Sequence, residues 1–371
     1  MKILIAPNSM KGSLDAFEFA ETVEQAFQKC SHSFEIRKMP VADGGDLTGK
    51  VLAQAFEARQ ISYTVHDPLR RKIQAEFWVS DKTGIIEMAE ASGIKRLKTE
   101  ELNPMKASSC GTGQLLSEAI KKGCTEILLG AGGSATVDGG SGMLEALGFQ
   151  FFDSEGNQLS GNGGNLEKIK KIDKPEFLKQ IKIQVISDVD NPLLGEKGAA
   201  NVFAPQKGAT PEMVETLERG LKNWLELLEK ESGSKLSGLK GSGAAGGIAL
   251  PLIAYFGAEI VPGADFILKK LNFEEHVQWA DIVITGEGKI DAQTLGDKAP
   301  VVVARIARQF KKPVIAIGGS IEKDATESFD AVFSFINRPL TLEESMKESG
   351  KLLFGFSYEL ARLLTICETS K

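Results

Sequence analysis

Both ends of the chain alternate short apolar runs with amphipathic helical segments, whereas the middle does not. "KILIA" and "FEIRKMPVA" are extended runs, and residues 14–30 between them carry apolar side chains at helical spacing. After residue 280 the rhythm returns in "DIVIT", "PVIAIGG" and "AVFSFI", with helical stretches at 298–310 and 341–366. This alternation is typical of an α/β domain, a parallel sheet covered by helices.

The region from residue 61 onward has a different pattern. Three runs alternate apolar and polar residues with period two and are joined by short turns, which predicts antiparallel hairpins. Hairpins do not belong inside a series of parallel βα units. We therefore predict one α/β domain built from residues 1–60 and 281–371, with a mixed α/β domain, residues 61–280, inserted between its halves. The length of 371 residues suits two domains.

Two helix starts carry specific capping signals. Asp15 followed by Glu18 predicts a capping box at the start of the first helix. Thr210 before Pro211 predicts the N-cap of an amphipathic helix in the middle region.

Composition excludes several classes of function. A net charge of -6 without any strongly basic stretch argues against a nucleic-acid partner. The four cysteines and three histidines lack the spacing of a zinc site or a disulfide framework. The first apolar run is too short for a signal peptide, and no run has membrane length, so we expect a cytoplasmic protein without a membrane partner.

Charged residues follow the predicted strands of the α/β domain. In an open parallel sheet, ligands bind beyond the carboxyl ends of the strands. The loops expected at that edge carry Lys11, Asp43, Asp46, Lys289 and Asp291. The segment "GEGKID" is expected to be a turn after the strand "DIVIT", with its two glycines bending the chain at a phosphate or metal site. Each loop alone also fits an ordinary structural turn.

The middle region offers matching features. "LLGAGGSATVDGGSG" enters a turn with six glycines between residues 130 and 142, whose N–H groups could surround a phosphate. "ISDVDNPLLG" places Asp188 and Asp190 two apart, on one face if the strand continues, as a magnesium or general-base pair. The glycines at 241–247 fit helix packing as well as anion binding. No GxxxxGK[ST] loop is present, and the glycine clusters do not spell GxGxxG after a strand with an acid some twenty residues further on. The residues thus favour metal-assisted phosphoryl transfer in a domain cleft.

These stretches resemble the bacterial glycerate kinase family of type 1. The motifs run collinearly from residue 3 to about residue 305: "IAPNSMKGSL", "VADGGD", "IEMAEASG", "NPMKASSCGTGQLL", "GAGGSATVDGGSG", "SDVDNPLLG", "GAANVFAPQKGAT", "GSGAAGGIA" and "ITGEGKIDAQT". The resemblance implies ATP-dependent, magnesium-dependent phosphorylation of D-glycerate, usually at the 2-hydroxyl. It also implies a flavodoxin-like domain with a restriction-endonuclease-like domain inserted.

We assign candidate roles on this basis. We expect Lys11 and Lys289 to neutralise the charge of a phosphate or carboxylate. The candidates for metal ligand or general base are Asp188, Asp190 and Asp291. The candidates for binding the nucleotide phosphates are Gly132, Gly133, Ser134, Gly286 and Gly288. The candidates for contacting the substrate or supporting its site are Asn8, Ser9 and Asp43.

The chain departs from the family pattern at several positions. Asn8 stands where Asp is usual, and an amide cannot serve as a base. The other departures are Met10 for Phe, Asp46 and Leu47 for Glu and Gly, Arg70 for Gly, Val137 for Asn and Asp297 for Gly. A catalytically weak or silent sensor of glycerate or nucleotide is therefore one alternative, and a nicotinamide-dependent oxidoreductase is another. The product, 2- or 3-phosphoglycerate, and the oligomeric state stay open, and a homo-oligomer is possible.

Overall fold

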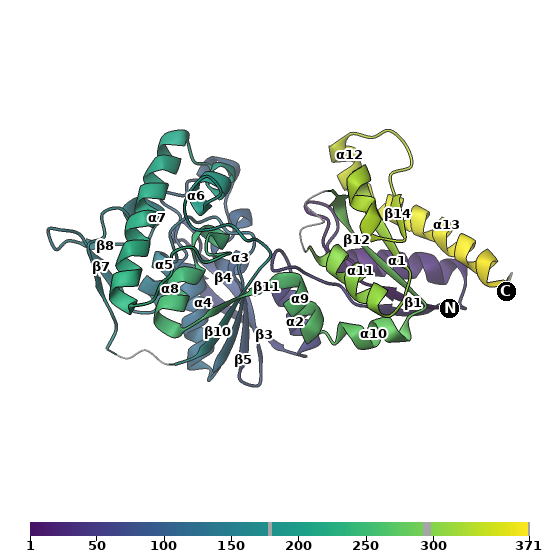
Figure 1. Ribbon diagram of the computed structural model, residues 1–371, viewed down its shortest axis with the longest axis horizontal. Coiled ribbons are helices and arrows are strands. Elements are labelled where there is room, and N and C mark those ends of the chain that lie inside the picture. The colour runs from purple at the N-terminus through teal and green to yellow at the C-terminus, as the bar shows by residue number, and fades with distance from the viewer. Residues whose placement is uncertain (177–179, 292–297, 370–371) are drawn as a thin grey trace. The chain divides into compact units, whose positions relative to one another are not determined.

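The computed structural model describes residues 1–176, 180–291 and 298–369 (Figure 1). Within these ranges the chain forms two compact units, each described by itself. Unit 1 consists of Met1–Asp43 and Gly263–Lys371, and unit 2 of Gly44–Pro262. The chain thus passes between the units twice.

Unit 1 is built on a parallel sheet of five strands in the order β14-β13-β12-β1-β2, formed by both ends of the chain. Its strands are β1 (Lys2–Ile5), β2 (Glu35–Lys38), β12 (Ile282–Ile290), β13 (Val314–Ile321) and β14 (Ala331–Ser334). Alternation along β1 sends Ile3 and Ile5 to one face and Leu4 to the other, so each face has its own apolar core.

Helices cover both faces of this sheet (Figure 1). One face carries α1 (Ala16–Cys30) packed against α13 (Ser349–Thr369). The other carries α9 (Gly263–Lys270), α10 (Phe273–Trp279) and α11 (Ala299–Gln309), while α12 (Leu342–Lys347) precedes α13. The expected single helix over 341–366 is interrupted: Glu348 has φ -96 and ψ 3, and the Ser349 hydroxyl donates to the Met346 carbonyl.

Unit 2 contains a mixed sheet of six strands in the order β11-β10-β6-β5-β4-β3. The strands β11, β10, β6 and β5 are parallel, and β3–β4 and β4–β5 are the antiparallel pairs predicted from period-two alternation. Their bounds are β3 (Arg59–His66), β4 (Lys72–Ser80), β5 (Thr83–Glu87), β6 (Glu126–Gly130), β10 (Lys182–Ser187) and β11 (Glu259–Pro262).

One core, separate from those of unit 1, holds unit 2 together. The α-helices around it are α2 (Thr48–Ala55), α3 (Met88–Ser92), α4 (Cys110–Lys121), α5 (Ser141–Ala146), α6 (Ala199–Phe203), α7 (Pro211–Ser232) and α8 (Ala249–Phe256). A small sheet has the order β8-β7-β9, with β7 (Gln150–Phe152), β8 (Gln158–Leu159) and β9 (Lys171–Asp173). Short 3-10 helices are η1 (Ile94–Arg96), η2 (Thr99–Glu101), η3 (Gly163–Asn165), η4 (Pro205–Lys207), η5 (Ala244–Gly246) and, in unit 1, η6 (Lys323–Ser328).

The units divide the chain at 43/44 and 262/263, not at the expected 60/61 and 280/281. Helix α2 packs on β4 and β5 of unit 2, and α9 and α10 pack on α11 of unit 1. An amphipathic helix has the same sequence pattern whichever sheet it covers, so periodicity could not assign these three helices.

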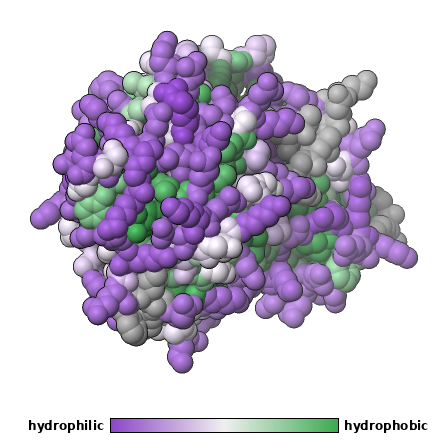
Figure 2. Space-filling model, turned by 60° about the vertical axis from the view of Figure 1, so that its left-hand side comes forward, coloured by the Kyte–Doolittle hydropathy of each residue, from purple (hydrophilic) through white to green (hydrophobic). Residues whose placement is uncertain are grey.

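The surface is polar where it can be seen. Figure 2 shows a mostly hydrophilic face with hydrophobic residues in separate patches. None of the helices in the described ranges combines the length and apolar character needed to cross a membrane.

Candidate functional site

The carboxyl edge of the unit 1 sheet brings several predicted residues together. The Asn8 side-chain amide donates to the Asp43 carboxylate at 2.9 Å, and both residues are buried. The backbone N–H of Asn8 donates to the Gly286 carbonyl at 2.8 Å. The segments after β1 and β2 therefore meet β12 at one edge, as parallel strand topology predicts.

Ser9 and Lys11 extend this edge along the segment after β1. The Ser9 N–H donates to the Asn8 side-chain oxygen at 2.8 Å. The Ser9 hydroxyl is buried, and among the described residues it has no hydrogen-bond partner. Lys11 is exposed. A buried hydroxyl without a partner suits a polar ligand, because such a group otherwise stays desolvated without compensation.

The expected turn at Gly286 to Gly288 is wrong. Strand β12 continues to Ile290, with Glu287 paired to Gly318 and Lys289 to Ser320 of β13. A Cβ on Gly286 would lie 2.2 Å from the Ile317 carbonyl oxygen. This glycine therefore permits close strand packing and does not bend the chain around a phosphate.

Lys289 and Asp291 lie side by side, as their sequence positions suggested. Lys289 Nζ is 3.1 Å from Asp291 Oδ2 and 2.7 Å from Glu322 Oε1. Both carboxylates, Glu322 first, raise the pKa of Lys289. Sequence reasoning missed Glu287, which is buried on β12 with Lys298 Nζ 3.9 Å away. A carboxylate between two glycines on a buried strand was the available signal.

Unit 2 has its own carboxyl edge, formed by the parallel strands β5, β6 and β10. The turn after β6 contains Gly132, Gly133 and Ser134, and Gly133 has a φ of 67°. A Cβ on Gly132 would lie 2.4 Å from Gly45 Cα, and one on Gly44 would lie 2.9 Å from Ser187 Cα at the end of β10. Three backbone segments are thus packed without room for side chains.

Asp46 reaches this same turn. Its carboxylate accepts from Lys95 Nζ at 2.6 Å, and its Oδ1 lies 3.2 Å from where a Cβ of Gly133 would be. Asp43 belongs to unit 1 and Asp46 to unit 2, so the two acids expected in one loop are held by different units.

Glu87, which ends β5, is a buried carboxylate that the sequence did not single out. Its oxygens accept from the N–H groups of Leu47 at 3.0 Å and Gly49 at 3.1 Å, at the start of α2. Burial raises the pKa of Glu87 to about 7, against these two hydrogen bonds, which lower it. A single acid within the apolar run "GIIEMA" was the available signal.

Lys207 is the second buried charge that sequence reasoning missed. It is 2% exposed, and burial lowers its pKa to about 7. Its ammonium donates to the Ser134 hydroxyl and to the Thr136 carbonyl, each at 2.7 Å. Asp138, on the same turn, is fully buried; burial raises its pKa, while N–H and O–H donors headed by Ser109 lower it.

The predicted pair Asp188 and Asp190 lies beyond the end of β10 at Ser187, so strand alternation does not relate them. Asp188 is exposed, and Asp190 has an exposed side chain 3.9 Å from Lys240 Nζ. Asp291 belongs to the other unit. Within residues 1–176, 180–291 and 298–369, no three His, Cys, Asp or Glu side chains are grouped as a metal site.

Two departures from the family pattern occupy left-handed backbone. Leu47 has a φ of 66° and Arg70 a φ of 64°, a region that favours glycine. Arg70 donates to both carboxylate oxygens of Glu145, at 3.1 and 2.6 Å. Val137 is buried in the unit 2 core, and Met10 in unit 1. Asp297 lies outside the described residues.

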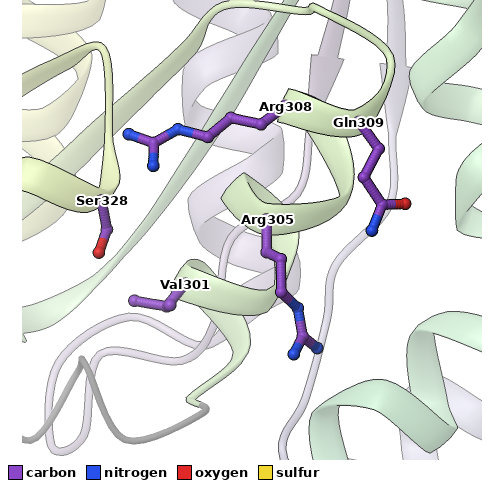
Figure 3. A pocket seen from close by; sticks show the side chains of 5 residues that line it. All are labelled: Val301, Arg305, Arg308, Gln309 and Ser328. Atoms are coloured by element: carbon purple, nitrogen blue, oxygen red, sulfur yellow. The ribbon is translucent and has the colours of Figure 1, made fainter.

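A pocket of about 380 Å³ lies on α11, and none of the residues that line it is a predicted site residue (Figure 3). Figure 3 shows Arg305 and Arg308 pointing in different directions from this helix. Arg305 donates to Asp265 at 2.5 Å, and Arg308 donates to the Glu327 carbonyl at 2.7 Å. These cations already have protein partners, so the pocket suggests no additional site residue.

The arrangement of elements matches a known architecture. A crystal structure of a protein from Salmonella typhimurium LT2 superimposes with a TM-score of 0.84 at 39% identity, covering 100% of this chain and 99% of that one. The chain is thus an α/β protein whose parallel sheet comes from both chain ends and which carries a second, mixed sheet.

Sequence comparison is equally specific. The model of the glycerate kinase family matches residues 3–365. Glycerate kinase of Bacillus subtilis is 39% identical over 100% of this chain and 99% of its own length, and glycerate kinase of Haemophilus influenzae is 42% identical over 98% and 99%. Glycerate 2-kinase of Escherichia coli K12 is 39% identical over 99% and 98%. The chain belongs to the glycerate kinase family, and the expected class of enzyme, a phosphotransferase, is confirmed.

Proposed function

We propose that this chain transfers the terminal phosphoryl group of ATP to the 2-hydroxyl of D-glycerate. The observation that carries the proposal is the family match over residues 3–365, which includes every polar segment at the two sheet edges. In the reaction the substrate hydroxyl oxygen attacks the γ-phosphorus, the bond to ADP breaks, and a base takes the hydroxyl proton. The name of the Escherichia coli relative, glycerate 2-kinase, supports the 2-position.

Candidate roles divide between the units. In unit 1, Asn8, Ser9 and Asp43 are the proposed substrate contacts or their support, with Lys11 and Lys289 as sources of positive charge. Because Lys289 already pairs with two carboxylates, we propose that it positions Asp291 and acts on a ligand only through it. In unit 2, the turn at Gly132, Gly133 and Ser134 is the proposed phosphate site.

Mg²⁺ is proposed to arrive with ATP. This cation keeps several waters and is bound in kinases by one or two carboxylates together with substrate phosphates, so three clustered acids are not required. Asp188, Asp190 and Asp291 stay the candidate ligands, each at or beyond the end of a parallel strand. When bound, the ion would neutralise charge on the transferring group.

The fold type of each unit and the location of the protein in the cell belong to this proposal as well. We propose that unit 1 is flavodoxin-like, unit 2 restriction-endonuclease-like, and the protein cytoplasmic. A homo-oligomer stays a prediction, to be checked by light scattering. The absence of a nucleic-acid or membrane partner likewise stays a prediction, and charge and composition are what support it.

The direct test is incubation with ATP, Mg²⁺ and D-glycerate, with separation of the products. We expect ADP and 2-phosphoglycerate in equal amounts. Formation of 3-phosphoglycerate instead would contradict the position of transfer. Binding of ATP or glycerate without ADP formation would contradict the kinase proposal and favour the sensor, which the amide of Asn8 in place of a carboxylate keeps under consideration.

The residue assignments have a separate test. Asp188→Ala and Lys289→Ala should each lower turnover by about a hundredfold or more, the usual scale for a positioned charge or base, with the fold retained by circular dichroism. Lys240→Ala is the matched control, because it removes only an exposed cation beside Asp190. Near-normal turnover in both test variants would refute the assignment.

A further inference from the structure

The Lys207 side chain reaches from η4 to the glycine-rich turn after β6, although the segment "GAANVFAPQKGAT" that contains it gave no role for the lysine. Its ammonium donates to Ser134 Oγ and to the Thr136 carbonyl. No carboxylate of the described residues forms an ion pair with it, although the group is almost completely buried. The charge of Asp138 favours the ammonium from beyond ion-pair distance. A buried ammonium without a directly bonded carboxylate is costly, so its position needs an explanation beyond packing.

The direction of the Lys207–Ser134 hydrogen bond decides what the serine can do. When Lys207 is protonated, its ammonium group has only donors, so the Ser134 oxygen is the acceptor. The hydroxyl hydrogen of Ser134 is then left for another acceptor, and none is found in the part of the chain that the structure describes. Ser134 is 8% exposed, so the residue is largely shielded from solvent without being completely enclosed.

The surroundings of the turn suit an anionic oxygen. Gly133 is left-handed, and successive backbone N–H groups in a turn of this kind can form an anion-binding concavity. The hydroxyl of Thr136 is also buried and has no partner among the described residues. Of the two acids near this turn, Asp46 is paired with Lys95, and Asp138 accepts hydrogen bonds from Ser109, Gly140 and Gly142.

We propose that Lys207 is a positioning residue: it fixes the Ser134 hydroxyl as a hydrogen-bond donor to an anionic oxygen bound at the turn of residues 132–136. The anion is a phosphate of the nucleotide or the carboxylate of glycerate, and this identification rests on the proposed function. The positive charge behind the hydroxyl strengthens the donor, and the bond to the Thr136 carbonyl holds the rest of the turn.

The test is a double-mutant cycle of Ser134→Ala and Lys207→Met, with KM for ATP and for D-glycerate, and turnover, measured for each variant. We expect each single variant to raise KM for one substrate about tenfold, the effect of losing a hydrogen bond to a charged oxygen. The double variant should be little worse than either single, because both remove the same donor. The substrate whose KM changes identifies the anion as phosphate or carboxylate.

Stability and equilibrium binding complete the experiment. Lys207→Met removes a buried charge, which favours stability, and leaves the Thr136 carbonyl without its donor, which costs stability, so we expect only a small change in Tm. Lys197→Met, at an exposed site of the same unit, should change neither KM nor Tm. Calorimetric titration with ATP and with D-glycerate separates this proposal from the proposed function: if the wild type binds without turnover, the kinase proposal fails, while weaker binding by Ser134→Ala still supports the role of Lys207.

Two results would overturn the proposal. Unchanged affinity in Ser134→Ala excludes its hydroxyl as a donor, whatever happens in Lys207→Met. Multiplying effects of about a hundredfold in the double variant would show that the two side chains act independently.

Discussion

Leu47 shows how a single backbone angle can carry a measurable cost. A left-handed conformation costs a residue with a side chain about 1 kcal/mol relative to glycine, and Leu47 has a φ of 66° at the start of α2. We expect Leu47→Gly to be about 1 kcal/mol more stable to urea than Leu47→Ala, although glycine also loses the contacts of the Cβ. If the two variants were equally stable, or if Leu47→Ala were more stable than Leu47→Gly, the backbone at this position would not be strained.

Glu87 should make the stability of the protein depend on pH. Its folded pKa of about 7 lies above the ordinary value of 4.5, so its contribution to stability is complete below pH 4.5 and is lost as pH rises toward 7. The free energy of unfolding of Glu87→Gln, relative to that of wild type, should therefore be about 3 kcal/mol higher at pH 7 than at pH 4.5. Denaturation at a series of pH values measures the difference.

The control for Glu87 is its neighbour Glu90. The charge of Glu90 helps to raise the pKa of Glu87, after burial, which is the larger cause. Glu90→Gln should therefore leave most of the pH dependence in place. A difference between Glu87→Gln and wild type that does not vary with pH would show that the Glu87 carboxyl is not desolvated.

At the scale of elements, strand β12 can be distinguished from the turn that the sequence suggested. Gly286→Ala should lower stability by about 2 kcal/mol or more, because the new Cβ would lie 2.2 Å from the Ile317 carbonyl oxygen. Gly288→Ala is the matched control two residues along, where the nearest atom would be Met10 Cα at 3.5 Å. Thermal unfolding of both variants gives the comparison, and equal losses would argue against the strand.

Local sequence signals predicted most helices and strands. They failed where the structure depends on contacts between residues far apart in the sequence. The capping box of Asp15 and Glu18 and the Thr210 cap are confirmed, since a cap depends only on residues three apart. The extension of β12 through Glu287 depends on its pairing with β13, which the glycines of the segment concealed. Lys207 could not be predicted as buried, because its partner at Ser134 is seventy-three positions away.

At the scale of the whole molecule, each unit has cores of its own. Unit 2 is continuous along the chain, so we expect the fragment Gly44–Pro262 to fold alone with a cooperative urea transition. The fragment Met1–Asp43 should stay unfolded, because β1 would lack its partner β12. Circular dichroism tests both expectations, and a fragment of unit 2 without a cooperative transition would show that the units are not independent.

Gly44, Gly45 and Gly132 crowd together so closely that none of the nineteen alternatives at Gly132 would fit without displacing main chain. In a survey of natural variants, such a position would be held fixed by space alone. Invariance at Gly132 would therefore carry no information about whether the turn contacts a nucleotide. A substitution at its neighbour Ser134 can test that contact, because removing the hydroxyl adds no atom between Gly132 and Gly45.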